Sequence, residues 1–320
     1  MEIKDKYGRS FKTLRVSLTN VCNLGCIYCV NSTESKPSSI SASKILEYKE
    51  LVLAIKKIHE LSTLETVRLT GGEPTLYKDL LPIIKEIRAL GIENIKMTSN
   101  GYLLKNMIPA LANAGLRKIN ISLDAIENKS FSKISGRKNI EKILEAIDSA
   151  LKHGIKIRLN AVILKGVNDD QIIPLLKFSE ERDITIRFLE LMRMGPLHNT
   201  KEFDTYFISE KELLTKIAEE YSFTPLLRKE SSTANYWSYS TNRKFGIIAN
   251  ESSPFCQDCN RLRLDSYGNI YGCLSNDTAI SINDSMLDKK LLKEQLEKAL
   301  SHKQELKFKG SAISMMAIGG

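Results

Sequence analysis

Long apolar runs are absent from the sequence. No stretch approaches the ~20 uninterrupted apolar residues that a membrane span requires, so we expect no membrane partner. The first eleven residues also lack the apolar centre of a secretory signal peptide. These absences predict a cytoplasmic protein. Its six cysteines should then be reduced thiols or metal ligands, because disulfides are rare in that compartment.

Compact basic tracts with interleaved aromatic residues are also absent, although the formal net charge is +9. Nucleic-acid-binding proteins usually carry such tracts, so we expect no RNA or DNA partner. The simplest explanation of the charge is a solvated basic surface. The alternative is an anionic small-molecule substrate, and among such ligands we favour a polyphosphate.

The first cysteine set has the spacing of metal ligands. Cys22, Cys26 and Cys29 form the pattern C-x3-C-x2-C directly after an alternating, strand-like run at 14–19. Thiolates suit iron–sulfur clusters, and three ligands on a four-iron cluster leave one iron open to a small molecule. A zinc site is the alternative, but zinc sites usually have four ligands and paired C-x2-C spacing.

A second cysteine set lies near the other end of the chain. Cys256 and Cys259 form C-x2-C, and Cys273 follows a stretch that predicts a β-hairpin and would return it to the same loop. This set predicts a second cluster with an open iron, or else a zinc site with one more ligand. Histidine is too scarce to supply that ligand readily, since none of the four lies near the motif: His59, His153, His198 and His302.

The first two-thirds of the 320 residues alternate β-branched runs with amphipathic helical stretches. Strands are predicted at Arg15–Thr19, Thr66–Thr70, Ile95–Thr98, Lys118–Leu123, Lys156–Leu164 and Thr185–Leu191. Helices are predicted near Ile45–Leu61, Leu80–Leu90, Leu104–Ala114, Ile140–His153 and Gln171–Glu181. Consecutive βα units predict a parallel α/β sheet covered by helices, without deciding whether the sheet closes.

Unusual residues follow several predicted strands, at the edge where active sites of such sheets gather. Gly72 belongs to a glycine pair after the second strand, where bare backbone can approach a ligand closely. Thr98, Ser122 and Met192 lie at the ends of the third, fourth and sixth strands. Each of them alone has an ordinary explanation, such as Ser122 capping the next helix. Their shared position predicts one pocket.

Arginines interrupt the predicted strands, where an unpaired buried charge is costly. Those facing the interior are predicted to be Arg15, Arg68, Arg158 and Arg187. Guanidinium groups match phosphate oxygens, which favours an anionic substrate. The alternative is ion pairing with interior carboxylates such as Glu73 or Glu190.

Two more arginines follow the C-x2-C motif. Arg261 and Arg263 are two residues apart, so on a strand they share one face, about 7 Å apart. We expect them to bind substrate beside the second cluster. The alternative is that they are exposed, or paired with Asp258 and Asp265.

The βα rhythm ends after residue 195, which predicts a barrel domain at 1–195 and a smaller α+β domain at 196–320. Residues 194–206 are predicted to be irregular. A helix at Ser209–Tyr221 with a capping box and strands near Asn235–Tyr239 and Lys244–Ile248 should follow. The apolar tail, which ends in Gly319 and Gly320, is predicted to insert toward the barrel mouth.

These motifs resemble a known superfamily and one family within it. The C-x3-C-x2-C motif with Tyr28 before its last cysteine, followed by the sequence GGEP at 71–74, is similar to the radical S-adenosylmethionine (SAM) superfamily. The second cysteine set, the two arginines after it and the final glycine pair resemble the MoaA family of GTP 3′,8-cyclases. The resemblance implies an incomplete (βα)6 TIM-like barrel with a smaller C-terminal α+β domain.

The same resemblance implies the chemistry and the site. Two 4Fe–4S clusters would be held by the two cysteine sets, and SAM would bind the first, giving a 5′-deoxyadenosyl radical that starts cyclisation of GTP to 3′,8-cyclo-7,8-dihydro-GTP. SAM contacts would be Tyr28, Gly72, Ser122 and Met192. GTP contacts would be Arg15, Arg68, Thr98, Arg158, Arg187, Arg261 and Arg263. Implied partners are an electron donor such as flavodoxin or ferredoxin and a downstream cyclic pyranopterin monophosphate synthase, with a homodimer possible.

Two other functions are compatible with parts of the sequence. A radical SAM enzyme that modifies peptides would share the barrel, although such enzymes usually carry more cysteines after it. A non-catalytic nucleotide- or metal-binding protein with structural zinc would share the cysteines. Iron and sulfide counts would separate the second alternative from a cluster enzyme.

Overall fold

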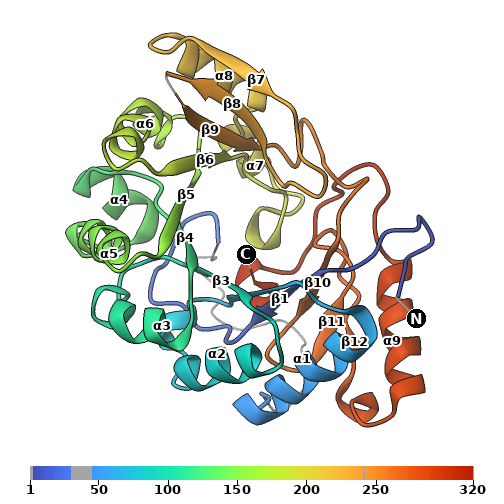
Figure 1. Ribbon diagram of the computed structural model, residues 1–320. Coiled ribbons are helices and arrows are strands. Elements are labelled where there is room, and N and C mark those ends of the chain that lie inside the picture. The colour runs from blue at the N-terminus through green and yellow to red at the C-terminus, as the bar shows by residue number, and fades with distance from the viewer. Residues whose placement is uncertain (1–2, 30–44, 241, 320) are drawn as a thin grey trace.

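The computed structural model describes residues 3–29, 45–240 and 242–319, which form a curved sheet with helices on its outer side (Figure 1). Parallel strands lie in sequence order at the centre of the sheet. They are β1 (Thr13–Ser17), β2 (Thr66–Thr70), β3 (Asn94–Ser99), β4 (Lys118–Ser122), β5 (Lys156–Val162) and β6 (Thr185–Leu189). Within the described residues β1 and β6 do not pair with each other, so these strands form an incomplete barrel.

Helices connect the parallel strands and cover their outer face. They are α1 (Tyr48–Ser62), α2 (Leu80–Ala89), α3 (Ile108–Ala114), α4 (Asn128–Ser135), α5 (Glu141–Lys152) and α6 (Ile172–Glu181). On α1 the buried residues Leu51, Ile55 and Ile58 recur at helical spacing, so one apolar stripe packs on the sheet. Apolar residues of the strands, such as Leu14 and Val16, complete this core.

Strands from the C-terminal part of the chain extend the sheet at both edges. At one edge β9 (Arg243–Ile248) pairs in parallel with β6, followed by β8 (Asn235–Tyr239) and β7 (Phe223–Leu226). At the other, β10 (Arg261–Leu264) pairs in parallel with β1, followed by β11 (Asn269–Tyr271) and β12 (Ile280–Ser281). The remaining helices are α7 (Lys201–Tyr206), α8 (Glu210–Ala218), α9 (Lys289–Ser301) and α10 (Met315–Ile318). The domain boundary at residue 195 stays a prediction.

The structure corrects several predicted elements, and strand β1, for example, spans Thr13–Ser17 and not Arg15–Thr19. Residues 194–206 are not irregular, because they contain a 3₁₀ turn at Gly195–Leu197 and helix α7, whose Phe203 is buried. Helix α4 was not predicted, since only a few of its residues are apolar. The first helix begins at Tyr48 and not at Ile45.

Other predicted elements are confirmed. Ser209 caps α8 in a reciprocal capping box with Glu212, and β10 and β11 form the expected antiparallel hairpin. No helix in the described ranges has the length and apolar character to cross a membrane.

Candidate active site

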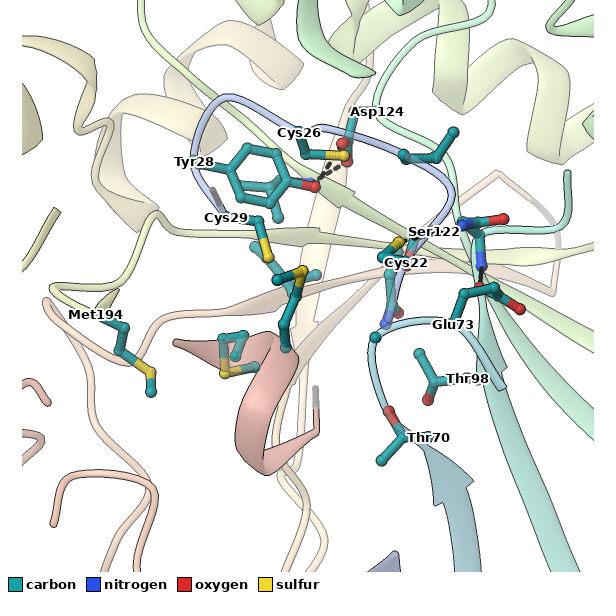
Figure 2. A pocket seen from close by; sticks show the side chains of 18 of the residues that line it. Cys22, Cys26, Tyr28, Cys29, Thr70, Glu73, Thr98, Ser122, Asp124 and Met194 are labelled. Atoms are coloured by element: carbon teal, nitrogen blue, oxygen red, sulfur yellow. Dashed lines mark hydrogen bonds between the residues drawn. The ribbon is translucent and has the colours of Figure 1, made fainter. Parts of the chain in front are cut away.

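The first cysteine set lies on the loop after β1, at the C-terminal ends of the parallel strands. Cys22, Cys26 and Cys29 line one cavity, which we call the cysteine cavity (Figure 2). Burial raises the pKa of all three thiols, that of Cys29 to about 11. Asp124 and then the neighbouring thiols raise the pKa of Cys26 further, and Cys22 raises the pKa of Cys29 further.

Two glycines hold the next loop against the cysteine loop. The amide of Gly72 donates to the carbonyl oxygen of Thr19 at 2.6 Å, and that of Glu73 donates to the carbonyl oxygen of Val21 at 2.8 Å. A Cβ on Gly72 would lie 2.3 Å from the Val21 oxygen, and Gly71 adopts a φ of 148°. The close contact of two protein backbones therefore requires glycine at 72, whatever ligand the cavity holds.

A buried carboxylate positions the first cysteine through Asn100. Glu73 accepts hydrogen bonds from the hydroxyl of Ser99 and the backbone amide of Asn100, both at 2.7 Å. The side-chain amide of Asn100 donates in turn to the Sγ of Cys22 at 3.7 Å. Burial raises the pKa of Glu73, and the bonds it accepts oppose that rise.

A second buried carboxylate lies beside Cys26. The hydroxyl of Tyr28 donates to Asp124 at 2.7 Å, as the dashed line in Figure 2 shows. The backbone amide of Val162 donates to the other carboxylate oxygen at 2.8 Å. Burial raises the pKa of Asp124 to about 6. Tyr28 is thus fixed by a hydrogen bond across the cavity, from the loop to the end of β4.

Basic side chains of the sheet lie opposite one another on neighbouring strands. Arg15 lies opposite Arg263 on one side and Arg68 on the other, and Arg68 lies opposite Lys96. Like charges directly opposite one another destabilise a sheet. Burial and then the surrounding arginines lower the pKa of Arg15 well below its usual range, and lower the pKa values of Arg68 and Arg263 to about 10.

No carboxylate within the described residues pairs with these arginines. Glu190 instead accepts from the backbone amides of Glu210, Glu251 and Ser252, so the predicted alternative of interior ion pairs is wrong. The Nε of Arg15 is buried without any hydrogen-bond partner.

Neutral amides hold the neighbouring guanidinium groups. The Oδ1 of Asn160 accepts from Arg187 at 2.6 Å. In the amide orientation that satisfies Asn120, its oxygen accepts from Arg187 at 2.8 Å and from Arg68 at 3.1 Å. The positive charge of the barrel interior is therefore oriented but not neutralised.

The second cysteine set lines the same cavity as these cations, which we call the arginine cavity. The β10–β11 hairpin returns Cys273 to the loop of Cys256 and Cys259, as predicted. Burial and then the other two thiols raise the pKa of Cys256 to about 11. Burial also opposes ionisation of Cys259, but Arg261 and Lys303 together lower its pKa to about 6.

The carboxylates suggested as partners of the two β10 arginines are engaged elsewhere. Asp258 forms an ion pair with Arg228 at 2.7 Å. Asp265 accepts from the side-chain amide of Asn269 at 2.9 Å and lies within its own turn. Arg261 and Arg263 are thus left facing the arginine cavity, which both of them line.

The C-terminal tail lies between the two cavities, within the curve of the sheet (Figure 1). Arg263 donates to the carbonyl oxygens of Ile318 and Gly319, and the hydroxyl of Ser314 donates to the carbonyl oxygen of Cys29 at 3.3 Å. Gly319 has a φ of 75°, and a Cβ there would lie 2.4 Å from the Cγ2 of Thr70. The described part of the tail is inserted as predicted; Gly320 lies outside the described residues.

Every predicted site residue lines one of the two cavities. The cysteine cavity is lined by the first cysteine set with Tyr28, Gly72, Ser122 and Met192. The arginine cavity is lined by the second set with Arg15, Arg68, Arg158, Arg187, Arg261 and Arg263. The cavities adjoin, because both are lined by Thr98, Asn160, Leu189, Met192 and Met315.

Sequence reasoning missed several side chains of the site. Lys96 and Asn120 lie on predicted strands, in register with Arg68 and Arg158, so strand alternation could have indicated them. Phe255 also lines the arginine cavity, and the guanidinium of Arg261 lies over its ring at 5.3 Å. Lys303 gave no local signal, because only the packing of α9 brings it to the second cysteine set.

Both cysteine sets fit iron–sulfur clusters. The six thiols form no disulfide, and the three of each set line one cavity. Three thiolates are a donor set that a four-iron cluster accepts, with one iron left open. Within the described residues no group of three or more His, Cys, Asp and Glu is arranged to hold a single metal ion.

Comparison with known proteins shows the superfamily to which the chain belongs. Residues 16–179 match the Radical SAM superfamily, and residues 184–310 match the family described as Molybdenum Cofactor Synthesis C. The fold is that of Streptococcus suis SuiB, with a TM-score of 0.64 at 18% identity over 92% of this chain and 68% of that chain. The chain is a member of the radical SAM superfamily.

Curated relatives define the family within that class. The chain is 35% identical to the GTP 3′,8-cyclase of Aquifex aeolicus (strain VF5) over 99% of both chains. It is 40% identical to the GTP 3′,8-cyclase of Staphylococcus haemolyticus (strain JCSC1435), over 85% of this chain and 81% of that protein. The chain belongs to the GTP 3′,8-cyclase family, as its motifs predicted.

Proposed function

We propose that this protein converts GTP to 3′,8-cyclo-7,8-dihydro-GTP, the first step of molybdenum cofactor biosynthesis. Family membership supports the reaction. The observation that carries the proposal is the arginine cavity, where cations that no carboxylate of the described residues pairs lie next to three thiols. Such a cavity is costly to a folded chain unless an anion occupies it, and a nucleoside triphosphate supplies that charge.

The cysteine cavity is the SAM site of this proposal. Cys22, Cys26 and Cys29 would hold a 4Fe–4S cluster, which would supply an open iron for SAM and the electron for its reductive cleavage. Tyr28, Gly72, Ser122 and Met192 line the same cavity and contact SAM, while Asn100 orients Cys22. Because the two cavities adjoin at Thr98 and Met192, SAM bound in one would lie next to substrate bound in the other, away from bulk water.

The arginine cavity is the GTP site. Arg15, Arg68, Arg158 and Arg187 bind the triphosphate, with Thr98 at the junction of the cavities. Arg261 and Arg263 would hold the nucleotide next to Cys256, Cys259 and Cys273, the residues that would ligate a second 4Fe–4S cluster. The chain thereby positions C3′ of the sugar and C8 of guanine, the two atoms that join, and this positioning is its main catalytic contribution.

The proposal extends to partners that the structure does not contain. An electron donor such as flavodoxin or ferredoxin would reduce the first cluster. A cyclic pyranopterin monophosphate synthase would consume the product. Assembly as a homodimer stays a prediction.

Arg15 offers a direct test of the GTP site. Arg15→Met keeps the length of the side chain but removes a charge that no carboxylate of the described residues pairs. We expect at least a tenfold loss of GTP affinity in anaerobic equilibrium dialysis, with the iron and sulfide of both clusters retained. Thermal stability should not fall, because the lost charge was unpaired and repelled by its neighbours.

Arg117→Met is the matched control, because Arg117 is exposed and its guanidinium donates to the carbonyl oxygen of Ala112, outside both cavities. It should bind GTP like the wild type. Equal GTP affinity of the Arg15 and Arg117 variants would contradict the assignment of the arginine cavity to the triphosphate.

A further inference from the structure

A buried lysine touches the second cysteine set, and the roles given above do not use it. Lys303 is 4% exposed. Its ammonium donates to the Sγ of Cys259 at 3.3 Å and to the carbonyl oxygens of Arg261 at 3.0 Å and Gly272 at 2.9 Å. An ammonium has three hydrogens to donate, so these contacts use all of them.

The charge of Lys303 is not balanced by a carboxylate anywhere in the described part of the chain. The ring of Phe11 lies 5.0 Å from its Nζ and offers only a weak attraction. Burial of an ammonium is costly without an opposite charge. Among the groups to which Lys303 donates, Cys259 alone forms an anion, as the thiolate that ligates a cluster.

Close packing holds the lysine in this place. A Cβ on Gly272 would lie 2.0 Å from the carbonyl oxygen of Ala299, so glycine is required for the end of α9 to rest against the end of β11. The backbone amide of Lys303 then donates to the carbonyl oxygen of Leu300 at 3.0 Å and continues the last turn of α9. This packing directs the side chain of Lys303 to Cys259 from the side away from the arginine cavity, which Lys303 does not line.

The first cysteine set receives a different donor. Its Cys22 faces the neutral amide of Asn100 at 3.7 Å, whereas Cys259 faces a charged ammonium at the shorter distance of 3.3 Å. Charge-assisted hydrogen bonds are about twice as strong as neutral ones. The two cysteine sets therefore differ in the charge of the group that donates a hydrogen bond to the cysteine sulfur.

We propose that Lys303 is a positioning residue for the second cluster, which fixes the Cys259 ligand and raises the reduction potential of that cluster. The inference rests on the proposed assignment of Cys256, Cys259 and Cys273 to a cluster. A positive charge and an N–H···S hydrogen bond stabilise a cluster that has gained an electron, because they offset its added negative charge. The end of α9 thus tunes the second cluster without touching substrate.

The test compares Lys303→Met and Lys303→Arg in the full chain, reconstituted anaerobically. Lys298→Met is the matched control, because it removes an exposed lysine from α9. Iron and sulfide are counted first. Redox titrations are then followed by electron paramagnetic resonance with SAM present, since SAM shifts the signal of the first cluster and so separates the two.

We expect Lys303→Met to keep both clusters and to lower the midpoint potential of the second one only. The ratio of reduced to oxidised second cluster at a fixed potential should fall at least tenfold, which is about 59 mV for a one-electron couple. Lys303→Arg should restore most of this shift, because it keeps a charged donor, and Lys298→Met should show none.

A second-cluster potential in Lys303→Met equal to that of Lys298→Met would overturn the inference. If Lys303→Met loses the iron of the second cluster, Lys303→Arg decides. If Lys303→Arg retains that iron at the wild-type potential, the result supports a role for a charged donor at this position. If Lys303→Arg also loses the iron, the result refutes that role. A wild-type protein with iron for one cluster only would refute the two-cluster assignment itself, a separate outcome visible before any titration.

Discussion

Replacing Gly72 with alanine tests the close backbone contact that holds the cysteine loop in place. The added Cβ would lie 2.3 Å from the carbonyl oxygen of Val21 and 3.0 Å from the amide of Cys22, whereas real Cβ atoms essentially never approach closer than 3.0 Å. The two loops would have to separate by roughly 0.7 Å, and overpacking of this kind costs about 1–3 kcal/mol. Because Cys22 is on the loop that moves, and a shift on the order of 1 Å can lower a rate about 100-fold, we expect a loss of that size in SAM cleavage.

The assay is anaerobic formation of 5′-deoxyadenosine from SAM with dithionite. Gly72→Ala should retain the iron of the second cluster and bind GTP normally, because Gly72 does not line the arginine cavity. Gly25→Ala is the matched control on the same cysteine loop, since its Cβ would have the carbonyl oxygen of Ser135 as nearest neighbour at 3.9 Å. Wild-type cleavage by Gly72→Ala, or an equal loss in both variants, would refute the reasoning.

Three further predictions follow from the site. Cys26→Ser should abolish 5′-deoxyadenosine formation and leave the second cluster's iron in place; cleavage at the wild-type rate would contradict the first cluster. Deletion of Gly319 and Gly320 should impair GTP cyclisation more than SAM cleavage, because Arg263 loses a carbonyl to which it donates, and equal losses would count against the tail's role. The folded apoprotein should lose stability as the pH rises from 3.8 to about 6, because the raised pKa of Asp124 makes the folded state hold that proton more tightly than the unfolded state. Thermal melting should show a smaller loss of stability over this pH range in Asp124→Asn than in the wild type.

Alternation of apolar and basic residues accounts for much of the fold prediction. Strand β2 was predicted with its observed ends, because Val67 and the threonines at both ends are β-branched and a glycine pair stops the strand. Helices α4 and α7 were missed because both are short and contain few apolar residues. Phe203 gives α7 its stability by packing against Leu164, Leu191 and Leu197, which are close only in the folded chain.

Some features of the site follow from residues close in sequence, and others depend on contacts between distant parts of the chain. Cysteine spacing is a local pattern, so both sets could be predicted as cluster ligands from the sequence alone. Gly72 was assigned to ligand contact, while its requirement for glycine comes from Val21 on another loop. Lys303 is 44 residues from Cys259, and its contact depends on how α9 packs against Gly272, which no local pattern encodes.

Product analysis of one anaerobic reaction tests the central claim most directly. The reconstituted protein is incubated with GTP, SAM and dithionite, and the nucleotides are separated and analysed by mass spectrometry. The account predicts a new isomer of GTP, formed together with 5′-deoxyadenosine, because the hydrogen atom taken from C3′ is replaced by one electron and one proton after C8 is joined. Formation of 5′-deoxyadenosine with GTP recovered unchanged, from protein that carries the iron of both clusters, would contradict it.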